Sequence, residues 1–318
     1  IFCVDSAVSK LNEKNIKPDA VFTIDAEKKP DDCLSKNQKF DSLFLSLKSP
    51  PQWTKLKETK KYFLSANIMT ENWLAEYGFS KTKPKVIGNC GITAANMAIF
   101  LGCSPIMLFG LDHAADEKTG KGHAESVNPN VSRATYNPKF CYHTVPGNYE
   151  PRVKTFLLNE WDKLNKLLSS APHYQEIWNI TDRGAKYDKA KLIHPDNFTF
   201  NKKEKTDNKD LRFSTQKIKT SEIQNLALKL KSFTQEHSEL FRSILEIDAI
   251  NDETCVLLSN LYKIEFTSKL LPNFTFKIAP ILLDWINTAY DEKVEVLSET
   301  KTLIMEIFAL TEKFDERK

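Results

Sequence analysis

The sequence lacks several features that would assign it to a protein class at once. Its 318 residues contain no apolar run close to the roughly 20 residues that a membrane-spanning helix needs, and no secretory signal opens the chain. The six cysteines are scattered without a CxxC pair, which predicts reduced thiols and gives no support for a zinc site or a disulfide framework. We therefore expect a cytoplasmic protein without a membrane span.

An excess of charge of one sign is also missing. The 45 basic and 42 acidic residues leave a net charge of +3, so the composition offers no global argument for a nucleic-acid partner, and we expect none. The hydrophobic share of 41% and the charged share of 27% are those of an ordinary globular protein. The length allows one large domain and a smaller one.

The first 200 residues alternate short β-rich runs with helical patterns. The runs lie at residues 1–4, 20–24, 43–47, 62–64, 106–109 and 176–180, and the helical patterns include residues 92–101 and 153–168. Alternation of this kind predicts an α/β fold with a mainly parallel sheet and helices on both faces. Residue 1 lies within a strand that is already under way, so we expect the element before it to be missing.

The composition changes after residue 200. Residues 201–210 read NKKEKTDNKD, a polar and charged run without apolar anchors, which predicts a solvated linker. Beyond it, helical periodicity continues without strand alternation. The sequence therefore predicts an α/β domain at residues 1–200, a linker at 201–210 and a helical C-terminal region at 211–318.

The most informative stretch begins at Gly88-Asn89-Cys90-Gly91, a turn of small residues before a helical pattern. Backbone amides at such a helix start can bind a phosphate, and the helix dipole assists. The turn lacks the full dinucleotide or P-loop pattern, so a tight turn that needs glycine dihedrals is the competing interpretation. Thr93 follows as a hydroxyl for a phosphate oxygen or for its own helix backbone.

Two carboxylates, Asp25 and Asp112, each follow an apolar strand. Ligands of open parallel sheets bind outside the carboxyl ends of the strands, so these side chains could hold a divalent metal, bond a ribose or act as a base. Either one could instead cap the next helix. We predict that Asp25, Asn89, Thr93 and Asp112 converge at one end of the sheet.

Six fragments in order resemble one family. They are Pro18-Asp19-x-Val21-x-x-x-Asp25, Gly88-Asn89-x-Gly91-x-Thr93-Ala94, Leu101-Gly102-Cys103-x-Pro105-Ile106, Gly110-x-Asp112-x-Ala114, Gly122-His123-Ala124 and Asn179-x-Thr181-x-x-Gly184-Ala185. Together they resemble the central domain of the bacterial motility accessory factors, a domain that is also similar to the archaeal 6-hydroxymethylpterin diphosphokinases. The resemblance covers about residues 1–195.

The resemblance implies a Rossmann-like domain and transfer of a nine-carbon acidic sugar onto serine and threonine residues of flagellin. It implies a cytidine-monophosphate-linked donor, bound by Asp25, Gly88, Asn89, Gly91, Thr93, Asn179 and Thr181. His123 and Asp112 are the implied catalytic residues, since a histidine near pKa 6.5 can take the proton of an acceptor hydroxyl. Whether a metal takes part stays open.

The chain departs from the family in two places. Family members carry a Gly-x-Gly-Pro-Ser turn before the strand that begins here, and this turn is missing. His113 stands where an aliphatic or aromatic residue is more usual. His113 and His143 have no support from the resemblance as catalytic groups, and we treat them as secondary.

Two other functions remain open at this point. A Mg-ATP-dependent pterin diphosphokinase would use Asp25 and Asp112 as a carboxylate pair for the metal, but it leaves the helical region unexplained. A non-catalytic flagellar accessory protein is compatible with the missing glycine turn.

Overall fold

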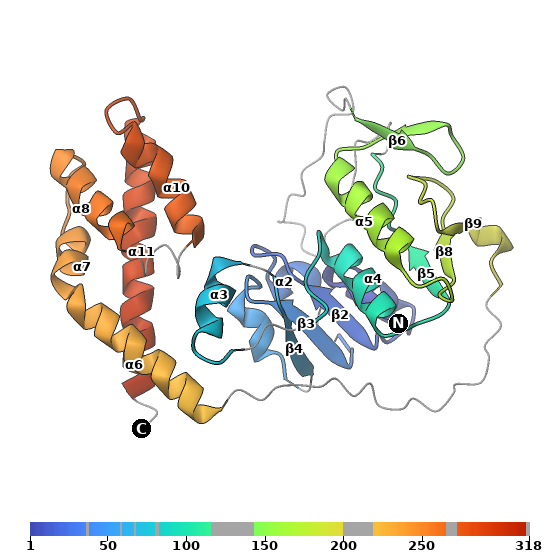
Figure 1. Ribbon diagram of the computed structural model, residues 1–318, viewed down its shortest axis with the longest axis horizontal. Helices are drawn as coiled ribbons and strands as arrows, with labels where there is room; N and C mark the ends of the chain where they lie inside the picture. Colours follow the sequence, from blue (N-terminus) through green and yellow to red (C-terminus); the bar gives the residue numbers. More distant parts are fainter. Residues whose placement is uncertain are drawn as a thin grey trace. The chain divides into compact units, whose positions relative to one another are not determined.

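The computed structural model describes residues 1–35, 38–57, 59–66, 68–79, 83–115, 143–199, 219–264 and 272–315. The chain divides into two compact units. The first consists of Ile1–Ala66 and Thr82–Arg212, and the second of Asn67–Lys81 and Phe213–Lys318. The first unit is α/β and the second is helical (Figure 1), so the predicted fold class is confirmed.

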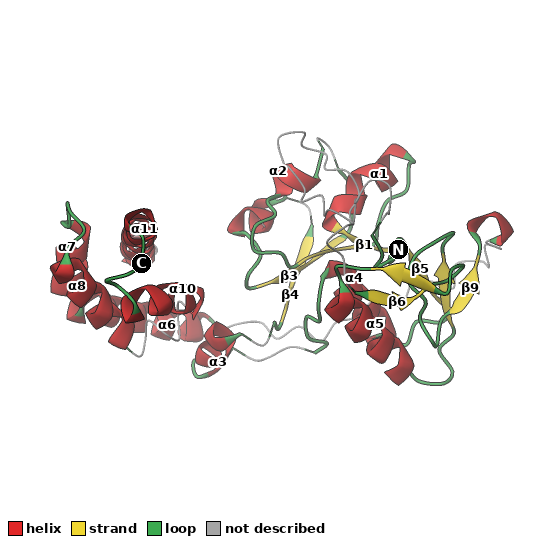
Figure 2. Ribbon diagram, turned by 90° about the horizontal axis from the view of Figure 1, so that it is seen from above, coloured by secondary structure: helices red, strands yellow, loops and turns green. Residues whose placement is uncertain are grey.

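A four-stranded parallel sheet forms the N-terminal half of the α/β unit. Its strands lie in the order β1-β2-β3-β4, with bounds Phe2–Val4, Ala20–Thr23, Ser42–Ser46 and Lys60–Leu64. The connections contain the short helices α1 (Val8–Glu13) and α2 (Pro30–Cys33) and the 3-10 turns η1 (Asp5–Ala7) and η2 (Pro51–Lys55). Figure 2 shows α1 and α2 on one side of this sheet and α4 on the other.

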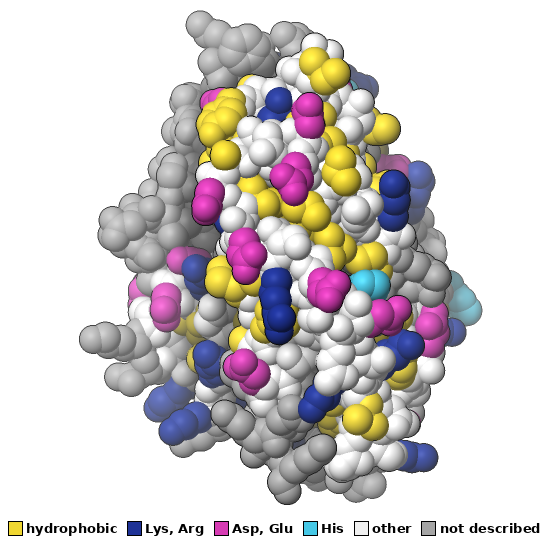
Figure 3. All heavy atoms as spheres, turned by 90° about the vertical axis from the view of Figure 1, so that its left-hand side faces the viewer, with side chains coloured by type: hydrophobic (Ala, Val, Ile, Leu, Met, Phe, Trp, Pro, Cys, Tyr) yellow, Lys and Arg dark blue, Asp and Glu magenta, His cyan; other side chains and the backbone are white. Residues whose placement is uncertain are grey.

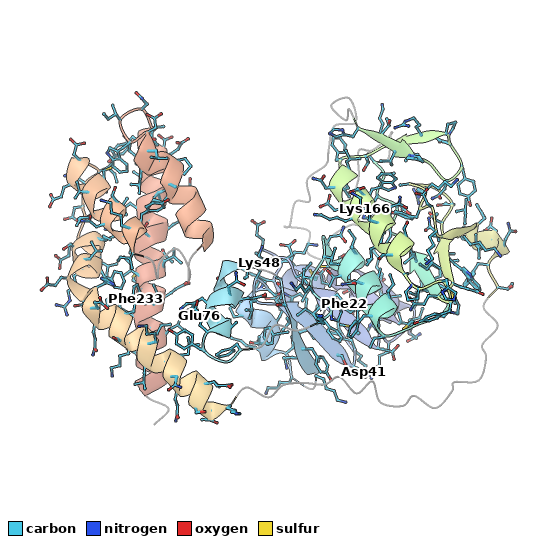
Figure 4. All side chains as sticks on the ribbon, viewed as in Figure 1. Phe22, Asp41, Lys48, Glu76, Lys166 and Phe233 are labelled. Atoms are coloured by element: carbon cyan, nitrogen blue, oxygen red, sulfur yellow. The ribbon has the colours of Figure 1, made fainter. Side chains whose placement is uncertain are left out.

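Both faces of the four-stranded sheet are apolar, as strands covered on both sides require. Cys3, Val21 and Leu43 are paired in register and pack with residues of α1, α2 and η2. Phe22 and Phe44 point to the opposite face, because each lies one residue further along its strand. Their rings stack there with centroids 4.8 Å apart. Figure 4 labels Phe22 at the centre of this sheet.

The C-terminal half of the α/β unit contains a second parallel sheet. Its order is β5-β8-β9, with bounds Ile106–Phe109, Ile177–Ile180 and Lys191–Ile193. A separate hairpin joins β6 (Thr144–Pro146) to β7 (Arg152–Lys154), and η4 (Pro195–Asn197) follows β9. The helices α4 (Cys90–Phe100) and α5 (Leu158–Ser170) pack on this sheet. Because α4 also contacts β1 and β2, it lies against strands of both sheets.

The helix expected over residues 153–168 begins later than predicted. Arg152–Lys154 forms strand β7, and the helix starts at Leu158. The reason is local pairing: Val153 pairs with Val145 of β6, and the Arg152 guanidinium donates to the Thr144 carbonyl at 2.8 Å. The apolar spacing of the predicted helix extends back to Val153, but Val153 pairs in the hairpin instead. Strand pairing therefore determines the structure of residues 152–154.

The second unit contains helices and no strand among its described residues. It contains α6 (Thr220–Glu236), α7 (Ser238–Leu245), α8 (Asp252–Lys263), α10 (Pro272–Leu283) and α11 (Tyr290–Asp315), together with α3 (Met69–Ala75) from the first third of the chain. Its core gathers Phe233, which Figure 4 labels on α6, with residues of the helices that follow. Apolar and charged side chains of both signs mix on the face in Figure 3. Among the described residues, no helix is long and apolar enough to cross a membrane.

Membership of α3 in the helical unit was not anticipated. Trp73 is 4% exposed and packs with Leu230 of α6 and Ile307 of α11. The predicted boundaries at residues 200 and 211, and the linker between them, lie outside the described residues and stay predictions.

Candidate functional site

The first turn of α4 is held in place by its own sequence. Gly88 has φ +55°, a left-handed conformation that glycine adopts without strain. Asn89 is the N-cap, and its Oδ1 accepts from the Ile92 N–H at 3.0 Å. The first amides of a helix, here those of Cys90 and Gly91, have no acceptor within the helix. The turn can therefore present two N–H groups to an anion.

The predicted glycine and threonine of this turn also have structural roles. A Cβ at Gly91 would clash with the Leu111 side chain, so glycine is needed where α4 meets the end of β5. Thr93 is fully buried; its hydroxyl donates to the Ile87 carbonyl at 2.9 Å and accepts from the Ile87 N–H at 3.1 Å. The Thr93 hydroxyl thus fastens α4 to the preceding loop, and its contact with a donor phosphate stays a prediction.

On the four-stranded-sheet side of this turn, two carboxylates share one cation. Asp5, directly after β1, is fully buried, and Asp25 follows β2 at partial exposure. The Lys28 Nζ lies 3.8 Å from Asp5 Oδ1 and 3.9 Å from Asp25 Oδ2. The Cys90 thiol donates to Asp5 Oδ2 at 3.9 Å, which joins the group to α4. The ends of β1 and β2 therefore meet the helix start.

Sequence reasoning missed Asp5 and Lys28 in this group. Asp5 follows an apolar strand in the same way as Asp25, so the signal that selected Asp25 was present for Asp5 as well. Burial raises the pKa of Cys90 to about 12, and the negative charge of Asp5 adds to the shift. The thiol is therefore protonated near neutral pH and is a poor nucleophile.

Asp112 lies on the other side of the turn, after β5. Its Oδ1 accepts from the Thr181 hydroxyl at 3.1 Å, and its carbonyl accepts from the Ala185 N–H at 2.7 Å. Gly184, at φ +83°, packs directly against the Asp112 backbone, so a side chain there would clash. Burial raises the pKa of the Asp112 carboxyl above its usual value, while the Thr181 bond and the Arg183 charge oppose the shift.

Asn179 and Thr181 come from β8 and its carboxyl end. Asn179 is buried within the sheet, paired in register with Leu108 of β5 and Leu192 of β9. Thr181 is also buried, and its hydroxyl joins Asp112 to the segment that follows β8. Of this pair, the structure brings Thr181 into contact with a predicted catalytic residue.

His113 connects the two elements around the site. It is buried at φ +42°, and its Nδ1 lies 2.8 Å from the Tyr187 hydroxyl, which donates to the Leu111 carbonyl at 2.6 Å. Its Nε2 lies 3.5 Å from Asn89 Nδ2. Since the tyrosine proton goes to Leu111, Nδ1 carries the imidazole proton and Nε2 accepts from Asn89. Burial lowers the pKa of His113 to about 4, so the ring is neutral.

The structure thus brings Asp25 and Asp112 to the helix start that contains Asn89 and Thr93, while Asn179 lies within the sheet of β5, β8 and β9. Asp25 reaches the helix start through Lys28 and Asp5, and Asp112 through its neighbour His113. His123 lies outside the described residues. Within the part of the chain that the structure describes, no group of three acidic, histidine or cysteine side chains is placed to hold a metal ion.

Part of the chain that builds this site is similar to a known family. The family model described as 6-hydroxymethylpterin diphosphokinase MptE-like matches residues 1–118. These residues carry an MptE-like domain. No curated protein and no solved structure matches the chain.

The MptE-like match includes β1 to β5, the turn before α4, and both Asp25 and Asp112. It ends before β8, β9 and the C-terminal helices. The match supports a kinase-like or transferase-like enzyme, and it does not extend to the motility accessory factors.

Proposed function

We propose that this protein is a transferase that uses a nucleotide-linked donor and binds the donor phosphate at the first turn of α4. The observation that carries the proposal is the meeting of three strand ends at that turn. Asp5 after β1 contacts Cys90 of the turn, and Asp25 after β2 is joined to Asp5 through Lys28. The Leu111–His113 segment after β5 contacts Gly91 and Asn89. Parallel sheets bind ligands at such a point, where the connections of neighbouring strands diverge.

The activity that we favour is glycosyl transfer from a cytidine-monophosphate-linked, nine-carbon acidic sugar to a serine or threonine hydroxyl of flagellin. In this reaction the acceptor oxygen forms a bond to the sugar carbon, and the bond from that carbon to the phosphate oxygen breaks. Cytidine monophosphate leaves with the bonding electrons, and the acceptor proton passes to a base, which we assign to His123. The amides of Cys90 and Gly91 stabilise the departing phosphate.

Asp112 has a separate part in this proposal. Its carboxyl group lies at the end of β5, is partly buried and is oriented by the Thr181 hydroxyl. An oriented carboxylate beside the phosphate site can accept from a ribose or sugar hydroxyl of the donor. Asp112 thus orients the donor while the helix start holds its phosphate.

One observation favours a second candidate, a Mg-ATP-dependent diphosphokinase. Asp5 Oδ1 lies 3.8 Å and Asp25 Oδ2 3.9 Å from the Lys28 Nζ, so both carboxylates face one positive charge. Carboxylates of this kind fit Mg²⁺, which binds through one or two carboxylates together with substrate phosphates. The ion would supply charge neutralisation at the phosphates. The name of the matching domain model agrees with this candidate.

Binding and transfer experiments distinguish the two candidates. We expect calorimetry to show cytidine monophosphate binding in the absence of metal, with cytidine, which lacks the phosphate, binding at least tenfold more weakly. Incubation with the sugar donor and purified flagellin should add one sugar mass per modified serine or threonine. Binding of ATP that requires Mg²⁺, with release of AMP when 6-hydroxymethylpterin is added, would instead establish the diphosphokinase. Failure to bind either nucleotide would reject both.

A further inference from the structure

We infer that Tyr149 and His194 form a subsite for the planar base of the donor nucleotide. The inference rests on the proposed function, because it places the base relative to the phosphate at α4. The two side chains come from different elements: Tyr149 from the loop between β6 and β7, and His194 from the residue after β9. Their rings meet edge to face, with centroids 5.9 Å apart.

Tyr149 is exposed and yet held. The residue is 51% exposed, while its hydroxyl donates to the Thr181 carbonyl at 3.0 Å. Its loop is also fastened: the Asn148 side-chain amide donates to the carbonyls of Arg183 and Ala185, each at 2.9 Å. An aromatic ring fixed at the surface offers a flat face for stacking without loss of side-chain freedom on binding.

His194 supplies a polar group beside this ring. Its Nδ1 accepts from the Asp196 N–H at 3.3 Å and lies 3.5 Å from Asp196 Oδ2. When Nδ1 accepts, Nε2 carries the proton of the neutral ring. The side chain is 38% exposed. A base that stacks on Tyr149 can therefore accept a hydrogen bond from His194 through a ring nitrogen or a carbonyl oxygen, and both are common to heterocyclic bases.

The contacts from this pair lead to the phosphate site. The Tyr149 hydroxyl donates a hydrogen bond to the Thr181 carbonyl, and the Thr181 hydroxyl donates one to the Asp112 carboxylate. His113, the residue after Asp112, contacts Asn89, the N-cap of α4. A nucleoside monophosphate has its base, ribose and phosphate in the same order. The geometry points to the base at Tyr149, the ribose hydroxyls at Asp112 and the phosphate at α4.

The chain contains a matched control for this assignment. Tyr174 is 62% exposed and also meets a histidine edge to face, His173, at 6.1 Å. It precedes β8 and therefore lies at the amino end of the strand, away from the proposed site. A general effect of removing an exposed tyrosine should appear equally at both positions.

The experiment measures binding of CMP, UMP, AMP, GMP and inorganic phosphate to the full chain by calorimetry. We expect Tyr149→Ala to weaken the tightest nucleotide by roughly 5- to 150-fold, the usual range for losing a stacking partner. The affinity of Tyr149→Ala for inorganic phosphate should be unchanged. Tyr149→Phe should bind the nucleotide within about threefold of wild type, since the ring remains. Tyr174→Ala should bind the nucleotide as the wild type does.

The outcomes separate the subsite from the function. Wild-type protein that binds a nucleotide, together with Tyr149→Ala that binds it equally well, overturns the subsite and leaves the proposed function standing. Wild-type protein that binds no nucleotide overturns both. If Tyr149→Ala does not fold, saturation-transfer NMR of the wild type decides: base protons should be saturated more strongly than ribose protons, and the reverse order would overturn the subsite.

Discussion

His113 holds a neutral imidazole in a left-handed backbone conformation, which is uncommon for residues other than glycine and which asparagine, aspartate and histidine adopt more often than most. Its contacts to Asn89 and Tyr187 require the neutral form, because Nε2 must accept. The pKa in the folded protein, about 4, lies below the unfolded value near 6.5. Between these values the unfolded chain binds a proton that the folded protein does not.

This difference predicts how stability depends on pH. The free energy of unfolding should fall as the pH decreases from 6.5 toward 4, and the contribution of His113 is up to roughly 3 kcal/mol. His113→Asn tolerates the backbone conformation and does not titrate. Urea denaturation at pH 7, 5.5 and 4.5 should therefore show the stability gap between wild type and this variant narrowing with acid. A constant gap would mean that His113 titrates normally.

The assignment of His123 as the base makes a kinetic prediction. His123→Ala should lower the rate of sugar transfer by roughly 10²- to 10⁴-fold, the usual range for loss of a general base. Donor binding should stay close to wild type, because the phosphate and ribose contacts come from other residues. His173→Ala, which removes an exposed histidine before β8, serves as the control and should transfer sugar as the wild type does. Full transfer activity in His123→Ala would remove this residue from the mechanism.

At the scale of elements, the start of α4 depends on its fit against the end of β5. Gly91→Ala should destabilise the α/β unit by roughly 1–3 kcal/mol, the range for overpacking a filled contact, because the new methyl group meets Leu111. The double variant with Leu111→Ala should recover part of this loss relative to Leu111→Ala alone. A double-mutant cycle in urea measures the coupling. Additive effects would show that the contact does not limit the position of α4.

Six strands of the parallel sheets could be predicted from the sequence because each is a short run rich in apolar residues, whereas β6, β7 and β9 could not. Residues 20–24 and 106–109 gave strands β2 and β5 close to their observed bounds. The division into two sheets could not be predicted, since register depends on contacts between distant residues. For the same reason, the sequence could not predict the hydrogen bond from the Asn148 side chain to the Ala185 carbonyl or the membership of α3 in the helical unit.

The candidate site could also be predicted only where it depends on local sequence patterns. Carboxylates after strands and a glycine turn before a helix are local patterns, so Asp25, Asp112 and the turn before α4 could be selected from sequence. What each side chain bonds to is not local. Thr93 has the spacing of a phosphate ligand, but its hydroxyl bonds to Ile87. His113 gave no positive signal, because its role depends on Tyr187, which lies far along the chain.

The chain as a whole should unfold in two steps, because its two units have separate cores. Each unit contains a buried tryptophan that can be replaced to test it: Trp53 in the α/β core and Trp73 in the helical unit. We expect Trp73→Ala to lower the free energy of unfolding of the helical unit by roughly 3–5 kcal/mol and to leave the α/β transition unchanged. Trp53→Ala should destabilise the α/β unit by a similar amount and leave the helical transition unchanged. Scanning calorimetry measures both. A single transition that either variant shifts would show one cooperative molecule.

Limited proteolysis gives the sharpest test of how the chain is divided. The charged run at residues 201–210 predicts cleavage between Lys202 and Lys209, and resistance there would contradict an exposed linker. The cut leaves α3 on the N-terminal fragment, while its packing partners α6 and α11 are on the C-terminal one. The fragments should therefore remain together on a sizing column despite the broken chain. In Trp73→Ala the same cut should release them, because the side chain that packs with Leu230 and Ile307 is gone. Separation of the wild-type fragments would show that α3 contributes too little to hold the helical unit.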